Sequence, residues 1–110
     1  SFQEHLDCIV KIVKRLLGKR SLVEVGCGKA YFLELLQSKG FEITGFDPTY
    51  EGKNKSIERN YFKKGVGVEA DGLILRHVLE HVQNPIEFLQ ELSTANKEKG
   101  KVYIEVPCFD

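Results

Sequence analysis

The chain has 110 residues, of which 42% are apolar; this suits one small domain with a core and excludes an intrinsically disordered chain. Sixteen basic side chains balance sixteen acidic ones, so the net charge does not favour a nucleic-acid-binding protein, although a local basic patch stays open. No apolar run approaches the roughly 20 residues of a membrane helix, so we expect neither a membrane span nor a membrane partner.

The first half of the chain predicts two helices and two strands. Apolar residues at helical spacing predict a helix over residues 2–17. Residues 22–26 are nearly all apolar, which is typical of a central parallel strand covered on both faces. A second helix is predicted over residues 30–38 and a second strand over residues 41–46, which ends before Pro48 because proline cannot continue the ladder.

The second half predicts a loop, two further strands, a helix and a last strand. Residues 49–60 are polar and lysine-rich and are interpreted as a loop, followed by a short third strand at residues 61–62. Residues 72–75 form a strongly apolar strand. The sequence Asn84-Pro85 predicts a helix start, and residues 101–106 alternate as a last strand.

Strands that alternate with helices predict an α/β domain with right-handed crossovers. The expected fold is therefore a Rossmann-like, doubly wound, mainly parallel sheet with flanking helices. We expect residues 1–110 to form a single domain. Its ligand should bind at the carboxyl ends of the strands, near the point where the strand order reverses.

The most informative stretch is the junction between the first strand and the second helix. Gly26 and Gly28 would let a ligand approach the backbone, and the helix that follows offers unpaired N–H groups. Tyr31 stands where a dinucleotide fingerprint has its last glycine, which opposes binding of a pyrophosphate. Asp47 ends the second strand, 21 residues after Gly26, and a carboxylate there can accept hydrogen bonds from a ribose diol. Glu24 is a carboxylate inside an apolar strand, either a structural brace for the turn, which we favour, or a direct ligand contact.

Four segments together resemble the front portion of class I S-adenosylmethionine-dependent methyltransferases. The first is V-E-V-G-C-G-K-A-Y-F-L, in which Ala30 replaces the usual third glycine of that family. The others are G-F-D-P, then A-D-G-L-I-L-R-H-V-L-E-H-V-Q-N-P, then G-K-V-Y-I-E-V-P. The third is close to the H-V-L-E-H form of methyltransferases of small metabolites, including sugar C-methyltransferases. The resemblance covers roughly residues 20–107 and depends on the order and spacing of the motifs.

The resemblance implies S-adenosyl-L-methionine as the cofactor. The backbone around Gly26, Cys27 and Gly28 would hold its methionine part, and Asp47 would bind its ribose hydroxyls. Methyl transfer from this cofactor needs the protein mainly to hold the cofactor and the methyl acceptor in position and to exclude water.

The other expected cofactor contacts are less sharply placed. Glu24 is included among them, and Arg76 or His77 would line the adenine or the methionine carboxylate. The acid that many members carry after their third strand has no clear counterpart, with Glu69 and Asp71 as candidates.

No catalytic residue or metal site can be assigned from the sequence. Cys27 has no histidine beside it, so small size at a crowded turn explains it better than a nucleophilic role. His77 and His81 lie four residues apart, but H-V-L-E-H is not the H-E-x-x-H pattern of a zinc helix. His81 as a general base stays an alternative. With Cys8 and Cys108, the cysteines form no CxxC pair, which favours a reducing cytoplasm.

The expected function is methyl transfer to a small-molecule acceptor, such as a sugar or another metabolite. Members of the family usually continue past their fifth strand, so we expect an incomplete domain whose last strand, an exposed sheet edge, could pair with a second copy. One alternative is a non-catalytic cofactor-binding or scaffold module of the same fold. A second is a nicotinamide-dependent oxidoreductase, which Tyr31 disfavours.

Overall fold

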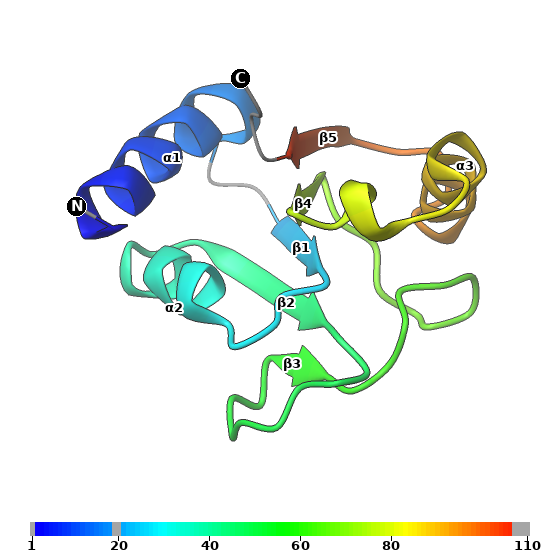
Figure 1. Cartoon of the computed structure of the whole chain (residues 1–110), viewed down its shortest axis with the longest axis horizontal. Coiled ribbons are helices and arrows are strands. Elements are labelled where there is room, and N and C mark those ends of the chain that lie inside the picture. The colour runs from blue at the N-terminus through cyan, green and yellow to red at the C-terminus, as the bar shows by residue number, and fades with distance from the viewer. Residues whose placement is uncertain (1, 19–20, 107–110) are drawn as a thin grey trace.

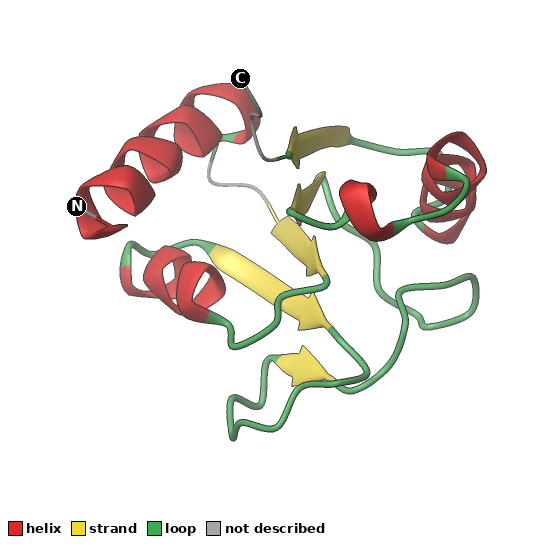
Figure 2. Cartoon of the chain, in the orientation of Figure 1, coloured by secondary structure: helices red, strands yellow, loops and turns green. Residues whose placement is uncertain are grey.

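The computed structural model describes residues 2–18 and 21–106 and contains one parallel sheet between helices (Figures 1 and 2). The strands are β1 (Ser21–Val25), β2 (Glu42–Phe46), β3 (Ile57–Glu58), β4 (Gly72–Arg76) and β5 (Lys101–Glu105). The helices are α1 (Phe2–Leu17), α2 (Tyr31–Ser38) and α3 (Pro85–Ala95), with a short 3-10 helix at Leu79–His81. The strand order is β3-β2-β1-β4-β5, which confirms the predicted doubly wound α/β architecture.

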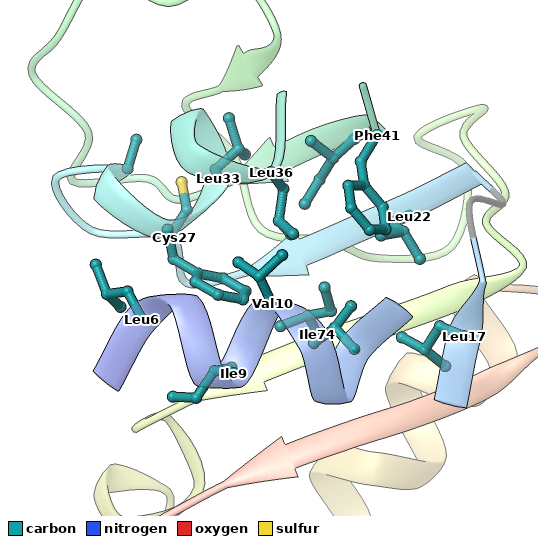
Figure 3. Packing of buried hydrophobic residues seen from close by; sticks show 14 of the residues in the cluster. Leu6, Ile9, Val10, Leu17, Leu22, Cys27, Leu33, Leu36, Phe41 and Ile74 are labelled. Carbon is teal, nitrogen blue, oxygen red and sulfur yellow. The ribbon is translucent and has the colours of Figure 1, made fainter. Parts of the chain in front are cut away.

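Helices α1 and α2 cover one face of the sheet, and Figure 1 shows them together on the side opposite α3. The helical spacing of apolar residues predicted that α1 has one buried face. Figure 3 shows that face packed against α2 and the strands. Each fully buried aliphatic side chain contributes about 2 kcal/mol to this packing. The side chains of α1 involved are Leu6, Ile9, Val10, Val13 and Leu17.

Helix α3 covers part of the other face. Leu92 and Ala95 are buried there against alternate residues of β1 and β4, and Phe88 and Leu89 are partly buried. Asn84 precedes the helix as predicted, but its side chain makes no capping hydrogen bond. Pro85 instead occupies the first helical position, where its missing N–H costs no hydrogen bond.

The register places alternate residues of the strands on the two faces. Glu24 pairs with Gly45 on one side and with Ile74 on the other. Ile74 belongs to the α1/α2 core. Glu24 is its register partner and Arg76 lies two residues after it on β4, so both side chains also face α1 and α2. Val25 belongs to the α3 core.

The predicted position of the third strand is wrong. The strand is Ile57–Glu58, and it pairs with the end of β2 through Gly45 and Phe46. Ile57 is buried, whereas Tyr61 of the predicted strand is 70% exposed. The buried residue that anchors the strand therefore lies four residues before Tyr61. Phe62 is buried for another reason: its ring lies 5.1 Å from that of Phe46, on the α3 face.

Strands β3 and β5 form the two edges of the described sheet. Val102 and Ile104 of β5 are 45% and 41% exposed, so the apolar alternation of this strand is only partly covered within residues 21–106. Among the described residues, we find no helix with the length and apolar character needed to cross a membrane.

Candidate functional site

The polar side chains singled out in the sequence meet at the carboxyl ends of the strands. β1 has β2 on one side and β4 on the other, so the strand order reverses there. Reversal makes the two crossovers leave in opposite directions and opens a crevice at the strand ends. The turn at Gly26–Gly28, the carboxylate of Asp47 and the residues after β4 all lie at this edge.

The turn after β1 uses backbone conformations that glycine favours. Gly26 has φ +74°, and a Cβ added there would lie 2.9 Å from Val78 Cγ2. Gly28 has φ +57° with nothing within 4 Å of an added Cβ, so the space beside it is open. Ala30 takes φ 69° although it has a Cβ, which costs about 1 kcal/mol. It is 1% exposed, so a small residue is needed where α2 begins.

Asp47 is fixed by three hydrogen bonds from its own chain. Its Oδ2 accepts a bond from the Gly28 N–H at 2.8 Å, and its Oδ1 accepts bonds from the Thr49 N–H at 2.8 Å and the Thr49 hydroxyl at 2.6 Å. Burial alone would raise the pKa of Asp47, but the bonds from Thr49 and Gly28 outweigh it and lower the pKa. The carboxylate is therefore charged at neutral pH and can accept at least one further hydrogen bond.

Glu24 is buried without such support. It is 3% exposed, and its Oε1 has no hydrogen-bond partner among the described residues. Burial raises the pKa of Glu24 to about 8; the charge of Arg76 lowers it, and those of Asp47 and Glu105 raise it. A buried carboxylate oxygen without a hydrogen-bond partner costs free energy, and it can accept a hydrogen bond from a ligand.

Arg76 is held on the α1/α2 face by Glu105 and an aromatic ring. Its Nε lies 2.9 Å from Glu105 Oε2, and its guanidinium carbon lies 4.5 Å from the centre of the Phe32 ring. Burial would raise the pKa of Glu105, but Arg76 and His77 lower it. Arg76 and Glu105 are register partners on β4 and β5, which explains why the pair forms.

His77 follows β4 in a left-handed conformation, with φ 59°. Its Nε2 lies 3.1 Å from Glu105 Oε1, and its Nδ1 lies 3.5 Å from Glu80 Oε2. Its backbone N–H donates to the carbonyl of Glu105 at 2.7 Å. A non-glycine residue with positive φ is uncommon and costs energy, so the tertiary contacts hold His77 at the edge of the site.

A cavity of about 1090 Å³ opens beside this edge on the α3 face. Its walls are the ends of β1 and β2, residues 61–64, His77 with Val78, and one side of α3. Its lining combines apolar side chains, among them Val25, Phe46 and Phe62, with polar ones that include Asp47. The volume is slightly above the usual range for sites that bury a small ligand, which is about 300–1,000 Å³.

The structure brings three of the seven predicted cofactor contacts to the cavity. These are Gly26, Asp47 and His77. Glu24, Cys27, Gly28 and Arg76 do not line it, and Arg76 faces the other side of the sheet. Glu69 bonds Lys97 and Lys99, and Asp71 lies beside Ser21 at the amino ends of the strands. These two acids, the candidate adenine contacts, therefore lie away from the carboxyl edge.

Cys27 is buried in the turn. Burial, with the charges of Glu24 and Asp47, raises the pKa of its thiol to about 12, which suits a packing role and not a nucleophile. Of the other cysteines, Cys8 is exposed and Cys108 lies outside the described residues.

His77 precedes the 3-10 helix in a left-handed conformation and His81 ends that helix, so the two histidines do not lie on consecutive turns of one α-helix. Within the described ranges, no cluster of three histidine, cysteine, aspartate or glutamate side chains could hold a metal ion.

Sequence reasoning missed three contributors to the site. Thr49 could have been found, because a threonine two residues after an aspartate can bond its carboxylate. Glu105 gave a weaker signal, an acid at the end of an apolar strand. Phe62 gave no signal of cavity lining, because its role depends on packing against Phe46.

The strand order, the glycine turn and the acid at the end of β2 define a Rossmann-like domain of the class I methyltransferase type. A family model described as "Methyltransferase domain" matches residues 2–110. The chain belongs to this methyltransferase domain family.

Two curated relatives are each 26% identical to the chain. One is a tRNA U34 carboxymethyltransferase of Pseudoalteromonas translucida, for which the match covers 90% of this chain and 35% of the relative. The other is a ubiquinone biosynthesis O-methyltransferase of Aeromonas salmonicida, for which it covers 91% of this chain and 48% of the relative. The chain thus spans between a third and a half of the length of these proteins.

Solved structures share the fold. The plantazolicin methyltransferase BpumL, in complex with a desmethyl-plantazolicin analogue and SAH, matches with a TM-score of 0.68 at 17% identity, covering 91% of this chain and 44% of that one. A SAM-dependent methyltransferase from Archaeoglobus fulgidus matches with a TM-score of 0.63 at 24% identity, covering 93% of this chain and 53% of that one.

Proposed function

We propose that this domain binds S-adenosyl-L-methionine and is the cofactor-binding part of a methyltransferase that acts on a small molecule. One observation carries the proposal: two carboxylates of different character, Asp47 and Glu24, flank one glycine turn at the strand-order reversal. Membership of the methyltransferase domain family supports it and disfavours the nicotinamide alternative. The relatives act on different acceptors by name, so the acceptor class rests on the resemblance of the H-V-L-E-H segment.

The polar groups of the cofactor can be paired with the polar groups of the site. The charged carboxylate of Asp47 would accept a hydrogen bond from the ribose, and the Thr49 hydroxyl beside it can turn to a second ribose oxygen. The unbonded oxygen of Glu24 would accept a hydrogen bond from the ammonium group of the cofactor's amino-acid part. The backbone of Gly26, Cys27 and Gly28 lies between these carboxylates and would contact the thioether chain.

When bound, the cofactor supplies a methyl group on a positively charged sulfur, which is already a good electrophile. The residues of this chain would hold that sulfur at the strand edge and exclude water from it. His77, which follows β4, lines the cavity, and we propose that it contacts a ligand there. A side chain that removes a proton is needed only where the acceptor must lose one.

The proposal is tested by calorimetric titration of S-adenosylhomocysteine into the chain. We expect micromolar binding, weakened at least tenfold in Asp47→Ala, because the ribose loses a charged acceptor. Asp71→Ala is the matched control, since Asp71 is an exposed acid at the amino ends of the strands, away from the proposed site. A folded wild-type chain that does not bind, or equal losses in the two variants, would contradict the proposed site.

The non-catalytic alternative binds the same cofactor and needs a different test. Methyl transfer from labelled S-adenosylmethionine to a panel of sugar and other small-molecule acceptors, by the longest form of the protein, separates the two. Transfer that is lost in Asp47→Ala supports the enzyme. Binding without transfer to any acceptor in the panel supports the scaffold module.

A further inference from the structure

One guanidinium lies between two carboxylates on the α1/α2 face of the sheet. Glu24 on β1, Arg76 on β4 and Glu105 on β5 come from neighbouring strands and point to the same face. The charge of Arg76 lowers the pKa of Glu24, and the charge of Glu105 raises it, so the three groups act on one another. Two carboxylates therefore compete for one cation.

The competition is settled in favour of Glu105. Arg76 Nε is 2.9 Å from Glu105 Oε2, and a second guanidinium nitrogen is 3.5 Å from Oε1. The Phe32 ring stacks on the guanidinium 4.5 Å away and restricts its orientation further. Glu24 Oε1 is left without a partner although the residue is 3% exposed.

Glu105 is itself fixed by other groups. Its Oε1 lies 3.1 Å from His77 Nε2 and 3.7 Å from His5 Nε2, which comes from α1. The side chains of Arg76 and Glu105 are only 13% and 15% exposed, so the pair is weakly screened by water. A partly buried pair whose carboxylate has a further hydrogen-bond contact, here to His77, keeps its geometry.

The arrangement has a consequence for ligand binding. If Arg76 turned to Glu24, its N–H groups would donate hydrogen bonds to the free oxygen of Glu24. A cationic ligand would then have to displace the guanidinium from that oxygen. Because Glu105 holds Arg76, the oxygen of Glu24 stays available. An unpaired buried carboxylate is unfavourable in the free protein and becomes favourable when a cation arrives.

We propose that Glu105 is a positioning residue: it holds Arg76 away from Glu24, and so keeps the Glu24 carboxylate free for the ammonium group of the ligand's amino-acid part. The inference rests on the proposed function, because it assigns the cationic group to that ligand. None of Glu24, Arg76 and Glu105 lines the cavity on the α3 face, because all three side chains face α1 and α2. Glu105 contacts Arg76 directly, so its effect on Glu24 would pass through Arg76.

Two ligands test this inference. S-adenosylhomocysteine carries the amino-acid part, whereas 5′-methylthioadenosine has the same adenosine and sulfur without it. We expect Glu105→Gln to weaken S-adenosylhomocysteine at least tenfold and to change the affinity for 5′-methylthioadenosine less than twofold. A merely structural role of Glu105 would weaken both ligands alike.

A double-variant cycle with Glu24→Gln shows through which residue Glu105 acts. If Glu105 acts through Glu24, the double variant binds S-adenosylhomocysteine no more weakly than Glu24→Gln alone, so the losses do not multiply. Glu105→Asp keeps the charge and should recover part of the affinity lost in Glu105→Gln. Circular dichroism and thermal unfolding confirm that each variant is folded.

The outcomes separate the two proposals. A wild-type chain that binds neither ligand overturns the proposed function. A wild-type chain that binds both, with Glu105→Gln unchanged or weakened equally for both ligands, overturns the inference and leaves the proposed function standing. Losses that multiply in the double variant also overturn it.

Discussion

Asp47 and Glu24 are carboxylates at the same edge of the same sheet, yet their surroundings differ in kind. Asp47 accepts three hydrogen bonds from Gly28 and Thr49, and its pKa is lowered. Glu24 is at least as deeply buried, its Oε1 accepts none, and its pKa is raised to about 8. The difference teaches that burial alone does not set the charge of an acid; the donors that reach it do.

The contrast also separates two ways to prepare a binding site. The donors around Asp47 fix a charged acceptor before any ligand arrives, which suits a neutral hydroxyl group. One oxygen of Glu24 has no hydrogen-bond donor among the described residues, which suits a ligand whose cationic group supplies both a donor and a positive charge. The first arrangement stabilises the fold and the second costs stability, a trade that is common where function needs a poorly satisfied group.

The largest expected effect is on stability and comes from Glu24→Gln. The unfolded chain releases the Glu24 proton near its ordinary pKa of 4.5, but the folded chain keeps it up to about 8. Between these values the folded state binds more protons, so wild-type stability falls as pH rises. The variant should be more stable at pH 8 by on the order of 3 kcal/mol, and by little at pH 5. Urea unfolding across this pH range measures the difference in the free energy of unfolding. If that difference is the same at every pH, the pKa of Glu24 is not raised in the folded state.

Asp47→Ala should act in the opposite direction. The N–H groups of Gly28 and Thr49 lose their acceptor, which destabilises the fold by about 2 kcal/mol at pH 7. Asp47→Asn keeps one acceptor oxygen and should lose less. The wild-type advantage is present above the ordinary pKa of 3.8 and is lost as pH falls through the lower folded value. Denaturant unfolding at pH 7 and in acid measures both variants, and an advantage that persists in strong acid would rule out the charge as its source.

Ligand binding should depend on pH through Glu24. Glu24 must lose its proton before it pairs with an ammonium group, so the affinity for S-adenosylhomocysteine should rise up to about tenfold between pH 6.5 and 7.5. The affinity for 5′-methylthioadenosine should stay level, and the rise should vanish in Glu24→Gln. Calorimetry at the two pH values is the measurement. An equal rise for both ligands would point to another titrating group.

The smallest expected effect tests the support of Asp47. Thr49→Val removes the hydroxyl bond at 2.6 Å and keeps the backbone bond at 2.8 Å. We expect a loss of about 1 kcal/mol in the free energy of unfolding at pH 7. The loss should be absent in the Asp47→Ala background, since the acceptor is gone. A loss that persists there would assign the effect to the packing of Thr49 instead.

The sequence by itself determined the order of elements and the end of the sheet where the candidate site lies. The apolar run before Gly26, the helical spacing of α1 and the Asn84-Pro85 start are local signals, and each produced its element. The acid after β2 follows from the same logic, because Pro48 ends the strand directly after it. These features depend on residues that are close in the chain, so local propensity and period are enough to find them.

The tertiary structure alone decided how the charges divide. Glu24, Arg76 and Glu105 are distant in sequence, and their competition exists only because β1, β4 and β5 lie side by side in one register. The position of β3 was likewise decided by its pairing with Gly45 and Phe46, against the aromatic signal at residues 61–62. Whether a buried acid finds donors depends on which backbone N–H groups and cations the fold brings within about 3 Å, and that distance is not written in any local stretch of sequence.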